Sequence, residues 1–357
     1  MKRLRIAWFG SSLVSAYWNG AATYYRGIVR GLHALGHHVT FFEADAYERQ
    51  RHRDIDDPPW ANVVVYDPDR WQEALARAQG FDVLVKSSGV GVNDAELEAT
   101  VLEAGASAVV FWDVDAPATL ARLESEPDDP FAQLVPRYDL VLTYGGGDPV
   151  VERYRALGAR DCIPVYNALD QETHHPVPAQ GRFRSDLAFV GNRLPDREAR
   201  VDEFFFRAAE LAADRSFLLG GSGWAERPLP PNVRYLGHVS TNDHNALNST
   251  PLAVLNVSRQ SMAENGWSPP TRVFEAAGAG ACVITDAWEG IELFLEPQRE
   301  VLVAEDAHAV ARHVRGLTPD MARRIGAAAL ARVLREHTYA HRAAQVEQVL
   351  QARELVR

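Results

Sequence analysis

Short apolar runs alternate along the first half of the chain with longer segments in which apolar residues recur every three or four positions. Between the first two runs, residues 20–36 place Tyr24, Ile28 and Leu32 at helical spacing and end in Gly36. An alternation of buried strands and amphipathic helices is typical of βαβ units. The pattern therefore predicts an α/β fold with a parallel sheet, whose first strands lie at 5–10, 38–44, 81–86, 108–113 and 139–144.

The pattern begins again in the second half, where "DLAFVGNR" at 186–193 repeats the charged start, apolar strand and glycine of "RIAWFGSS" at 5–12. The polar segment 170–184 has the composition of an interdomain connection. We expect two doubly wound domains, residues 1–178 and 179–337, and a C-terminal helix at 338–357 that packs on either domain. Such domains bind ligands at the carboxyl ends of their strands, in the cleft between them. Further apolar runs of the second domain lie at 216–221, 233–237, 252–257 and 281–286.

Composition narrows the possible partners. The 357 residues, 46% of them hydrophobic, suffice for two domains. Asp and Glu outnumber Lys and Arg by 48 to 37, a net charge of -11, which repels nucleic acid and anionic lipid. Cys162 and Cys282 lie in or beside apolar runs without CxxC spacing, which favours buried free thiols over a disulfide. No apolar stretch approaches the roughly 18 residues of a membrane span, and none resembles a signal peptide. We expect a soluble, cytoplasmic protein.

Glycines and arginines gather at strand ends of the second domain. Gly191 and Asn192 follow its first strand, with Arg193 and Arg197 close behind. Backbone N–H groups of such a loop and a guanidinium group both bind phosphate. Each feature alone could be a turn or a surface arginine, but together they predict a diphosphate pocket and a nucleotide-linked substrate. The loop at 220–224 and two later strand ends add Gly221, Ser222, Arg259 and Arg272.

Glu275 lies near the start of a predicted helix in "SPPTRVFEAAGAGACVITD", residues 268–286. A carboxylate in the first turn of a helix stabilises it by about 0.3–1 kcal/mol. The same carboxylate could instead hold a ligand. The residues of this stretch alone leave both interpretations open.

The stretch from residue 269 to 317 resembles the C-terminal signature of glycosyltransferases of the GT-B architecture, in which two Rossmann-like domains face an interdomain cleft. In particular it is similar to the group that includes the spore-maturation CgeB type, with an Arg-x-Phe-Glu-Ala helix, a small-residue turn, an apolar strand and a late "ELF". Segments in the same order agree at 110–117, 138–159, 163–176, 187–197 and 233–240. The resemblance implies a hexosyltransferase that moves a sugar from a UDP- or GDP-linked donor to a hydroxyl of a glycan, small molecule or protein.

The resemblance also assigns roles on the donor side. It implies that Glu275 accepts hydrogen bonds from the nucleotide ribose. Thr271 and Arg272, at the helix N-terminus, would then face the donor diphosphate. His238 and Val239 would lie beside the base.

One position departs from the family pattern. Many retaining members carry Glu-x7-Glu, whose first glutamate lies near the transferred sugar. Trp267 stands at that position here, and the nearest acid is Glu264. We therefore expect Trp267 or Glu264 to contact the sugar, and the sequence leaves inverting and retaining stereochemistry open.

Asp113 and Asp115 follow the strand at 108–113, at a position that resembles the family's acidic pair. In an inverting enzyme one of them would take the proton of the acceptor hydroxyl, whereas in a retaining enzyme the leaving phosphate would do so. They could instead cap a strand end, or form a metal-binding Asp-x-Asp. Because the arginines offer the same charge and no spaced Cys/His set occurs, we expect neither a metal ion nor a cofactor.

Small residues in three loops of the first domain are expected to border the cleft. A glycine at the start of the first helix would let the backbone approach the donor phosphate closely. These residues are Gly10, Ser11, Asn19, Gly20, Gly145 and Gly146.

Two other function classes remain possible at this point. Nucleotide-sugar epimerases share the architecture and need no acceptor, and a non-catalytic two-domain protein could close on a small ligand. The sequence names neither the sugar, the base, the acceptor nor the oligomeric state.

Overall fold

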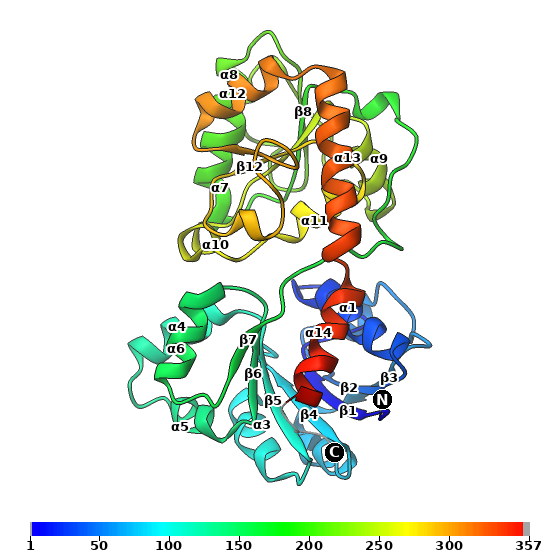
Figure 1. Cartoon of the computed structure of the whole chain (residues 1–357), viewed down its shortest axis with the longest axis vertical. Coiled ribbons are helices and arrows are strands. Elements are labelled where there is room, and N and C mark those ends of the chain that lie inside the picture. Colours follow the sequence, from blue (N-terminus) through cyan, green and yellow to red (C-terminus); the bar gives the residue numbers. More distant parts are fainter. Residues whose placement is uncertain (1, 353–357) are drawn as a thin grey trace. The chain divides into compact units, whose positions relative to one another are not determined.

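The computed structural model describes residues 2–352, which form two compact units (Figure 1). The first unit contains the described residues up to Tyr166 together with those from Tyr339 onward, and the second is Asn167–Thr338. The sequence pattern places the boundary later, after residue 178. Residues 167–178 group with the second unit because Leu169 forms a parallel bridge with Thr338 and packs tightly on Gly278, where an added Cβ would lie 2.3 Å from Cδ1 of Leu169.

Within the described residues, the sheet of the first unit has seven parallel strands in the order β3-β2-β1-β4-β5-β6-β7. Strands β4 and β5 are buried at every position, as expected for a parallel sheet with helices on both faces. The strands are β1 (Arg5–Gly10), β2 (His38–Ala44), β3 (Asn62–Tyr66), β4 (Val83–Ser87), β5 (Ala108–Asp113), β6 (Leu140–Thr143) and β7 (Cys162–Pro164). The helices are α1 (Ala22–Ala34), α2 (Trp71–Arg77), α3 (Asp94–Thr100), α4 (Ala116–Ser125), α5 (Pro130–Leu134), α6 (Gly147–Ala156) and α14 (Tyr339–Ala352).

Helix α14 packs against α1 and belongs to the first unit (Figure 1). The sequence alone left open which of the two domains this helix packs on. Glycines on α1 allow the close approach. A Cβ at Gly27 would lie 2.3 Å from the ring of Tyr339, and one at Gly31 would lie 2.6 Å from Cβ of Ala343. The end of the predicted helix, residues 353–357, lies outside the described residues.

The second unit contains a parallel sheet whose described strands have the order β10-β9-β8-β11-β12-β13. The strands are β8 (Leu187–Val190), β9 (Phe217–Gly220), β10 (Val233–Tyr235), β11 (Ala253–Asn256), β12 (Val283–Asp286) and β13 (Leu302–Ala304). The helices are α7 (Pro195–Val201), α8 (Ala208–Leu211), α9 (His244–Ser249), α10 (Gln260–Asn265), α11 (Thr271–Gly278), α12 (Ala307–Gly316) and α13 (Pro319–Glu336).

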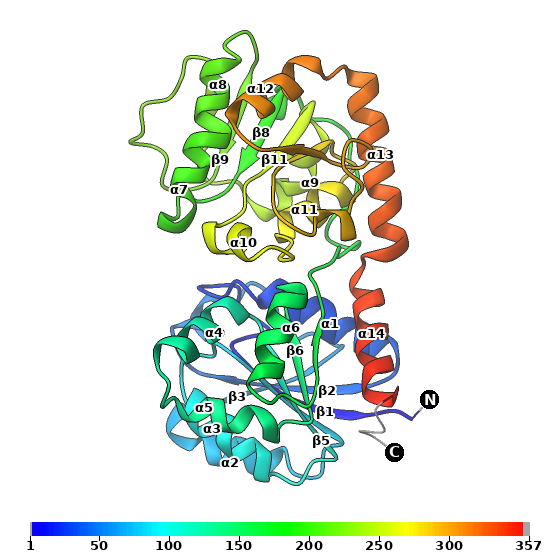
Figure 2. The same cartoon turned by 60° about the vertical axis from the view of Figure 1, so that its left-hand side comes forward.

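The order of the second sheet reverses between β8 and β11, which are neighbours in the sheet although β9 and β10 lie between them along the chain. Open parallel sheets bind ligands at the carboxyl ends of the strands that flank such a switch point. Figure 2 shows α7, α10 and α11 gathered at one end of this unit. The predicted α/β fold with two parallel sheets is confirmed, and the second unit offers a switch point at which a ligand could bind.

No helix within residues 2–352 is both long and apolar enough to span a membrane.

Candidate functional site

Arg197, in the first turns of α7, lies at the switch point of the second sheet. Its Nη2 donates a hydrogen bond to the carbonyl oxygen of Asn192 at 2.7 Å, and its guanidinium lies over the ring of Phe189. Its Nε is buried and has no hydrogen-bond partner among residues 2–352. Burial lowers the pKa of Arg197, and the charges of Arg272 and Arg259 lower it further. The charge of Asp196 acts in the opposite direction, and Arg259 and Arg272 are paired with Asp196 and Glu275. Three arginines therefore lie close enough to influence one another, which makes this a candidate anion site.

The N-terminus of α11 is a second feature of this region that favours an anion. Pro270 is its N-cap residue, so no side chain caps the helix, and the first turn carries no acidic residue. Uncapped N–H groups and the helix dipole favour an anion at this end. The Nη1 atom of Arg272 is buried and makes no hydrogen bond within the described part of the chain.

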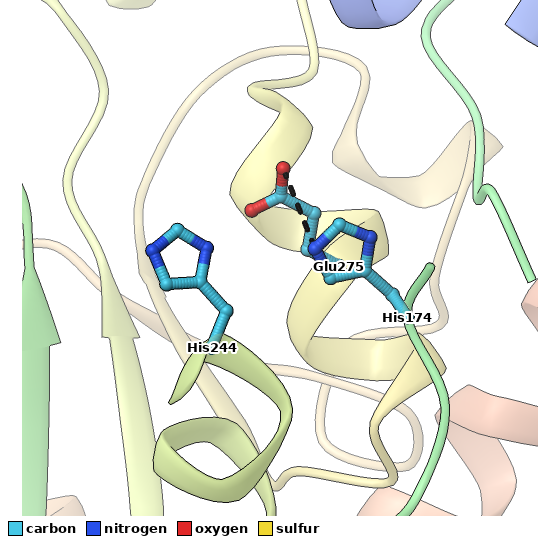
Figure 3. Close-up of side chains that lie close together, drawn as sticks. All are labelled: His174, His244 and Glu275. Atoms are coloured by element: carbon cyan, nitrogen blue, oxygen red, sulfur yellow. Dashed lines mark ion pairs between the residues drawn. The ribbon is translucent and has the colours of Figure 1, made fainter. Parts of the chain in front are cut away.

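Glu275 projects from α11 toward His174 and His244 (Figure 3), and the charge of Arg272 also acts on it. Its Oε2 lies 3.3 Å from Nη1 of Arg272, and its Oε1 lies 4.0 Å from Nε2 of His174. Burial raises the pKa of Glu275, but the charges of Arg272, His174 and His244 outweigh this effect and lower the pKa below the ordinary value. A carboxylate that stays ionised while only 19% exposed is a strong hydrogen-bond acceptor.

His244 begins α9 and completes this group of side chains. Burial lowers its pKa first, and the charge of Arg272 lowers it further, while the charge of Glu275 acts in the opposite direction. Nitrogen or oxygen atoms of His174, His244 and Glu275 all lie within 4.8 Å of one another. No sequence pattern indicates this group, because the three residues come from separate segments that only the fold brings together. The polar segment that contains His174 gave no signal for it.

The glycine loops after β8 and β9 are tied to each other. Ser222 donates its backbone N–H to Oδ1 of Asn192 at 2.9 Å, and Arg193 donates its backbone N–H to the carbonyl of Ser222 at 2.9 Å. Gly221 has φ +119°, and a Cβ there would lie 2.2 Å from the carbonyl oxygen of Gly191. Gly191 is less constrained, since a Cβ would lie 2.6 Å from Nη2 of Arg197, the end of a flexible side chain. These predicted donor-binding residues thus shape the loops that hold Arg197.

The other predicted donor-binding residues include two arginines that are paired with acidic side chains and a histidine that is exposed. The guanidinium of Arg193 pairs with Glu198 at 2.5 Å, and that of Arg259 pairs with Asp196. His238 is exposed, while Val239 is buried against Gly220. Their contact with a nucleotide stays a prediction.

A buried ion pair that the sequence analysis does not find supports the switch point. Arg200 donates from Nη2 to Oδ2 of Asp286 at 2.6 Å, at the end of β12. Asp286 also accepts hydrogen bonds from the backbone N–H and hydroxyl of Ser258. Burial raises the pKa of Asp286, although Arg200 and Ser258 act against it. The network joins α7 to the ends of β11 and β12. Its member Ser258 directly precedes Arg259 in the chain.

Glu264 lies in α10, and Trp267 lies in the loop between α10 and α11. Trp267 has φ +40°, donates its N–H to the carbonyl of Glu289 at 2.6 Å, and packs so closely on Gly290 that a Cβ there would lie 2.3 Å from Cδ1 of the indole. Glu264 accepts a hydrogen bond from Gln260 at 2.6 Å on the exposed side of α10. A sugar contact by either residue stays a prediction.

In the first unit, Asp113 is fully buried at the end of β5. Its Oδ2 accepts a hydrogen bond from the hydroxyl of Tyr154 at 2.5 Å, and its Oδ1 accepts hydrogen bonds from Ser88, Thr119 and the backbone of Asp115. Burial raises its pKa despite these bonds. This geometry favours the alternative that Asp113 has a structural role and caps the end of the strand. Asp115, in contrast, is exposed at the start of α4.

The small residues of the first unit differ in what constrains them. Ser11 donates its hydroxyl to Oδ1 of Asn19 at 2.8 Å, and Gly10 and Gly146 are required by the nearby side chains of Phe41 and Val150. At Gly20 an added Cβ would have no atom of the described residues within 4 Å. Gly145 follows β6 and is buried. Whether they border a ligand stays a prediction.

Comparison with known proteins adds a family and a fold. Residues 197–348 match the family described as Glycosyl transferase-like. No curated protein matches the chain in sequence. Among solved structures, sucrose-phosphate synthase from Thermosynechococcus elongatus has a TM-score of 0.71 at 15% identity, covering 98% of this chain and 99% of that one. An alpha-glucosyltransferase in complex with UDP-glucose and DNA has a TM-score of 0.71 at 13% identity, with 98% and 100% covered. Anabaena Alr3699/HepE in complex with UDP and glucose has a TM-score of 0.67 at 13% identity, also with 98% and 100% covered.

At these identities the structural similarity shows the fold, which is that of the GT-B glycosyltransferases. The matched family region includes Arg197, Arg272, Glu275 and the whole sheet from β9 onward. The predicted likeness to glycosyltransferases is confirmed for the fold and for the family match of residues 197–348. The finer likeness to the CgeB-type group stays a prediction.

Proposed function

We propose that the protein is a glycosyltransferase that takes its sugar from a nucleotide-diphosphate donor, held at the switch point of the second unit. The observation that carries the proposal is the placement of Arg197, Arg272 and an ionised Glu275 around the uncapped N-terminus of α11. The family match of residues 197–348 and the UDP and UDP-glucose complexes among the structural neighbours support it.

The diphosphate is assigned to Arg197, Arg272 and the first turn of α11. Nη1 of Arg272 makes no hydrogen bond in the described chain but is ion-paired with Oε2 of Glu275 at 3.3 Å. Nε of Arg197 is buried and has no hydrogen-bond partner among the described residues. A buried donor of this kind is costly unless a ligand satisfies it. As the sugar leaves, negative charge develops on the diphosphate, and donors already in position stabilise it without reorganising.

The ribose is assigned to Glu275. An ionised carboxylate only accepts hydrogen bonds, so two neighbouring hydroxyl groups are suitable partners. The alternative, that Glu275 complements the helix dipole, is less well supported, because the first turn of α11 contains no acidic residue and the dipole effect falls off beyond it. UDP is the first nucleotide to test, with GDP as the comparison.

The acceptor is proposed to be a hydroxyl group, and the transfer to need no metal ion. The arginines would supply the charge that a cation supplies elsewhere. If the enzyme inverts, Asp115 is the better candidate for the base, because its carboxylate reaches solvent while that of Asp113 is enclosed. If it retains, the leaving phosphate takes the proton.

Thermal-shift measurements against UDP, GDP and their sugar conjugates, followed by product analysis, test the proposal. A nucleotide that binds only the folded state raises the melting temperature. We expect one nucleotide to do so, and its sugar conjugate to release nucleoside diphosphate as the sugar is transferred. Conversion of the donor without this release would indicate an epimerase, and the absence of any nucleotide effect would contradict the proposal.

A further inference from the structure

His174, His244 and Glu275 form a compact group with metal-binding chemistry in the second unit. They come from the segment before β8, from the first residue of α9 and from α11, and Figure 3 shows their side chains converging. One candidate ligand atom from each lies within 4.8 Å of the other two. His174 is buried and the other two are partly buried.

Two imidazoles and one carboxylate are a ligand set that Zn²⁺ uses in sites with an open fourth position. With metal–ligand bonds of 2.0–2.1 Å, tetrahedral ligand atoms lie about 3.3 Å apart. The candidate ligand atoms lie at most 4.8 Å apart, so each pair must approach by up to about 1.5 Å to bind one ion.

The neighbours of His174 and Glu275 leave one ligand atom of each facing the other. The hydroxyl of Thr173 lies 3.0 Å from Nδ1 of His174, so Nε2 is the nitrogen that faces Glu275. A hydrogen bond at the second ring nitrogen is the usual support of a metal-bound histidine. On Glu275, Arg272 occupies the side of Oε2, while Oε1 faces His174. Arg272 orients the carboxylate but repels a cation, so we expect weaker binding than at a closed structural zinc site.

We infer that His174, His244 and Glu275 bind a divalent transition-metal ion of the zinc type in the nucleotide-free protein, and that the ion and the nucleotide exclude each other. The metal site does not depend on the proposed function. The mutual exclusion does rest on the proposed function, because the metal ion and the nucleotide would both need the carboxylate of Glu275. Zinc would then inhibit sugar transfer.

Calorimetric titration of ZnCl2 into the nucleotide-free protein tests the metal site. We expect binding of one ion, weakened by at least about tenfold in His174→Ala and in His244→Ala, since loss of even an outer-shell partner costs 10–100-fold. His175→Ala is the matched control, because His175 is the exposed neighbour of His174 and should bind zinc like the unaltered protein. Circular dichroism checks the fold of each variant, and His174→Gln and His244→Gln replace any alanine variant that unfolds.

Equal zinc affinity in the unaltered protein and in both histidine variants would overturn the site, as would the absence of zinc binding. The exclusion is tested by titrating UDP with and without saturating zinc. We expect zinc to weaken UDP binding at least about tenfold in the unaltered protein but not in His244→Ala. Unchanged UDP affinity would overturn the exclusion. If UDP does not bind at all, the proposed function and the exclusion fail, while the zinc titration still decides the metal site.

Discussion

Nη1 of Arg272 lies 3.3 Å from Oε2 of Glu275, one turn further along α11. The pair joins the side chain proposed for the diphosphate to the one proposed for the ribose. It also sets the charge of the site, because Arg272 is the largest of the influences that lower the pKa of Glu275 against the effect of burial. A change at either residue should therefore alter the other.

The first prediction concerns pH. The lowered pKa of Glu275 keeps it ionised as the pH falls through the ordinary glutamate range, so UDP binding should persist there. Arg272→Ala removes the largest influence that lowers the pKa of Glu275, so burial should raise this pKa. The pH below which UDP binding is lost should therefore be higher in this variant. Calorimetry with UDP at a series of pH values checks this.

The control for this series is Arg299→Ala, which removes an exposed arginine of the same unit. UDP itself titrates identically in each experiment, so a difference between variants reports the protein. An acid limb at the same pH in Arg272→Ala and Arg299→Ala would count against the pairing.

The second prediction separates the two aspartates after β5. Asp113→Ala leaves the hydroxyl groups of Ser88, Thr119 and Tyr154 without their acceptor, so the free energy of unfolding should fall by about 2 kcal/mol or more. Asp115→Ala should unfold like the unaltered protein, since its side chain makes no capping bond within α4 as described. Urea denaturation of both variants is the measurement, and equal stability of the two would refute the structural role of Asp113.

The third prediction concerns the ion pair between Arg200 and Asp286. Because Asp286 is fully buried, Arg200→Ala strands a carboxylate and should cost about 3 kcal/mol of unfolding free energy near neutral pH. The pKa of Asp286 is already raised by burial and should rise further in the variant. The deficit relative to the unaltered protein should shrink as the pH falls and Asp286 becomes protonated in both. A deficit that does not vary with pH would contradict this explanation.

The fourth prediction compares two glycines. Gly221→Ala places a Cβ 2.2 Å from the carbonyl of Gly191 at φ +119°, and should destabilise the protein by about 1–3 kcal/mol and weaken UDP binding. Gly20→Ala meets no atom of the described chain within 4 Å, so its melting temperature should not change. Thermal melts of both variants decide whether the tight loop contact is as the structure shows it.

The sequence predicts most strands because their apolar runs are long and buried. It misses β3 (Asn62–Tyr66), an edge strand whose burial is intermittent, and the short strands β7 and β13. Edge strands and three-residue strands bury little apolar surface and leave a weak pattern, although the run at 233–237 did predict β10, which is an edge strand of three residues. The boundary between the units lies earlier than the sequence predicts, because the β-bridge between Leu169 and Thr338 joins residues that are far apart in the chain.

The candidate site could be proposed from the sequence where one segment carries it. Arg197 and Arg272 are indicated by their positions at strand ends, whereas the role of Glu275 is implied only by the family resemblance, and binding by all three stays a prediction. His174, His244 and the pair of Arg200 with Asp286 depend on contacts between distant segments. No periodicity in the sequence reports such contacts.

The central claim is that Glu275 holds a nucleotide, and UDP calorimetry on Glu275→Ala and Glu292→Ala tests it most directly. Glu292 is an exposed glutamate of the same unit and serves as the control. Loss of hydrogen bonds to a charged acceptor costs about 1.5–3 kcal/mol, so Glu275→Ala should weaken UDP binding about 10- to 100-fold. Glu292→Ala should bind UDP like the unaltered protein. Equal UDP affinity in Glu275→Ala and Glu292→Ala, with both variants folded, would contradict the account.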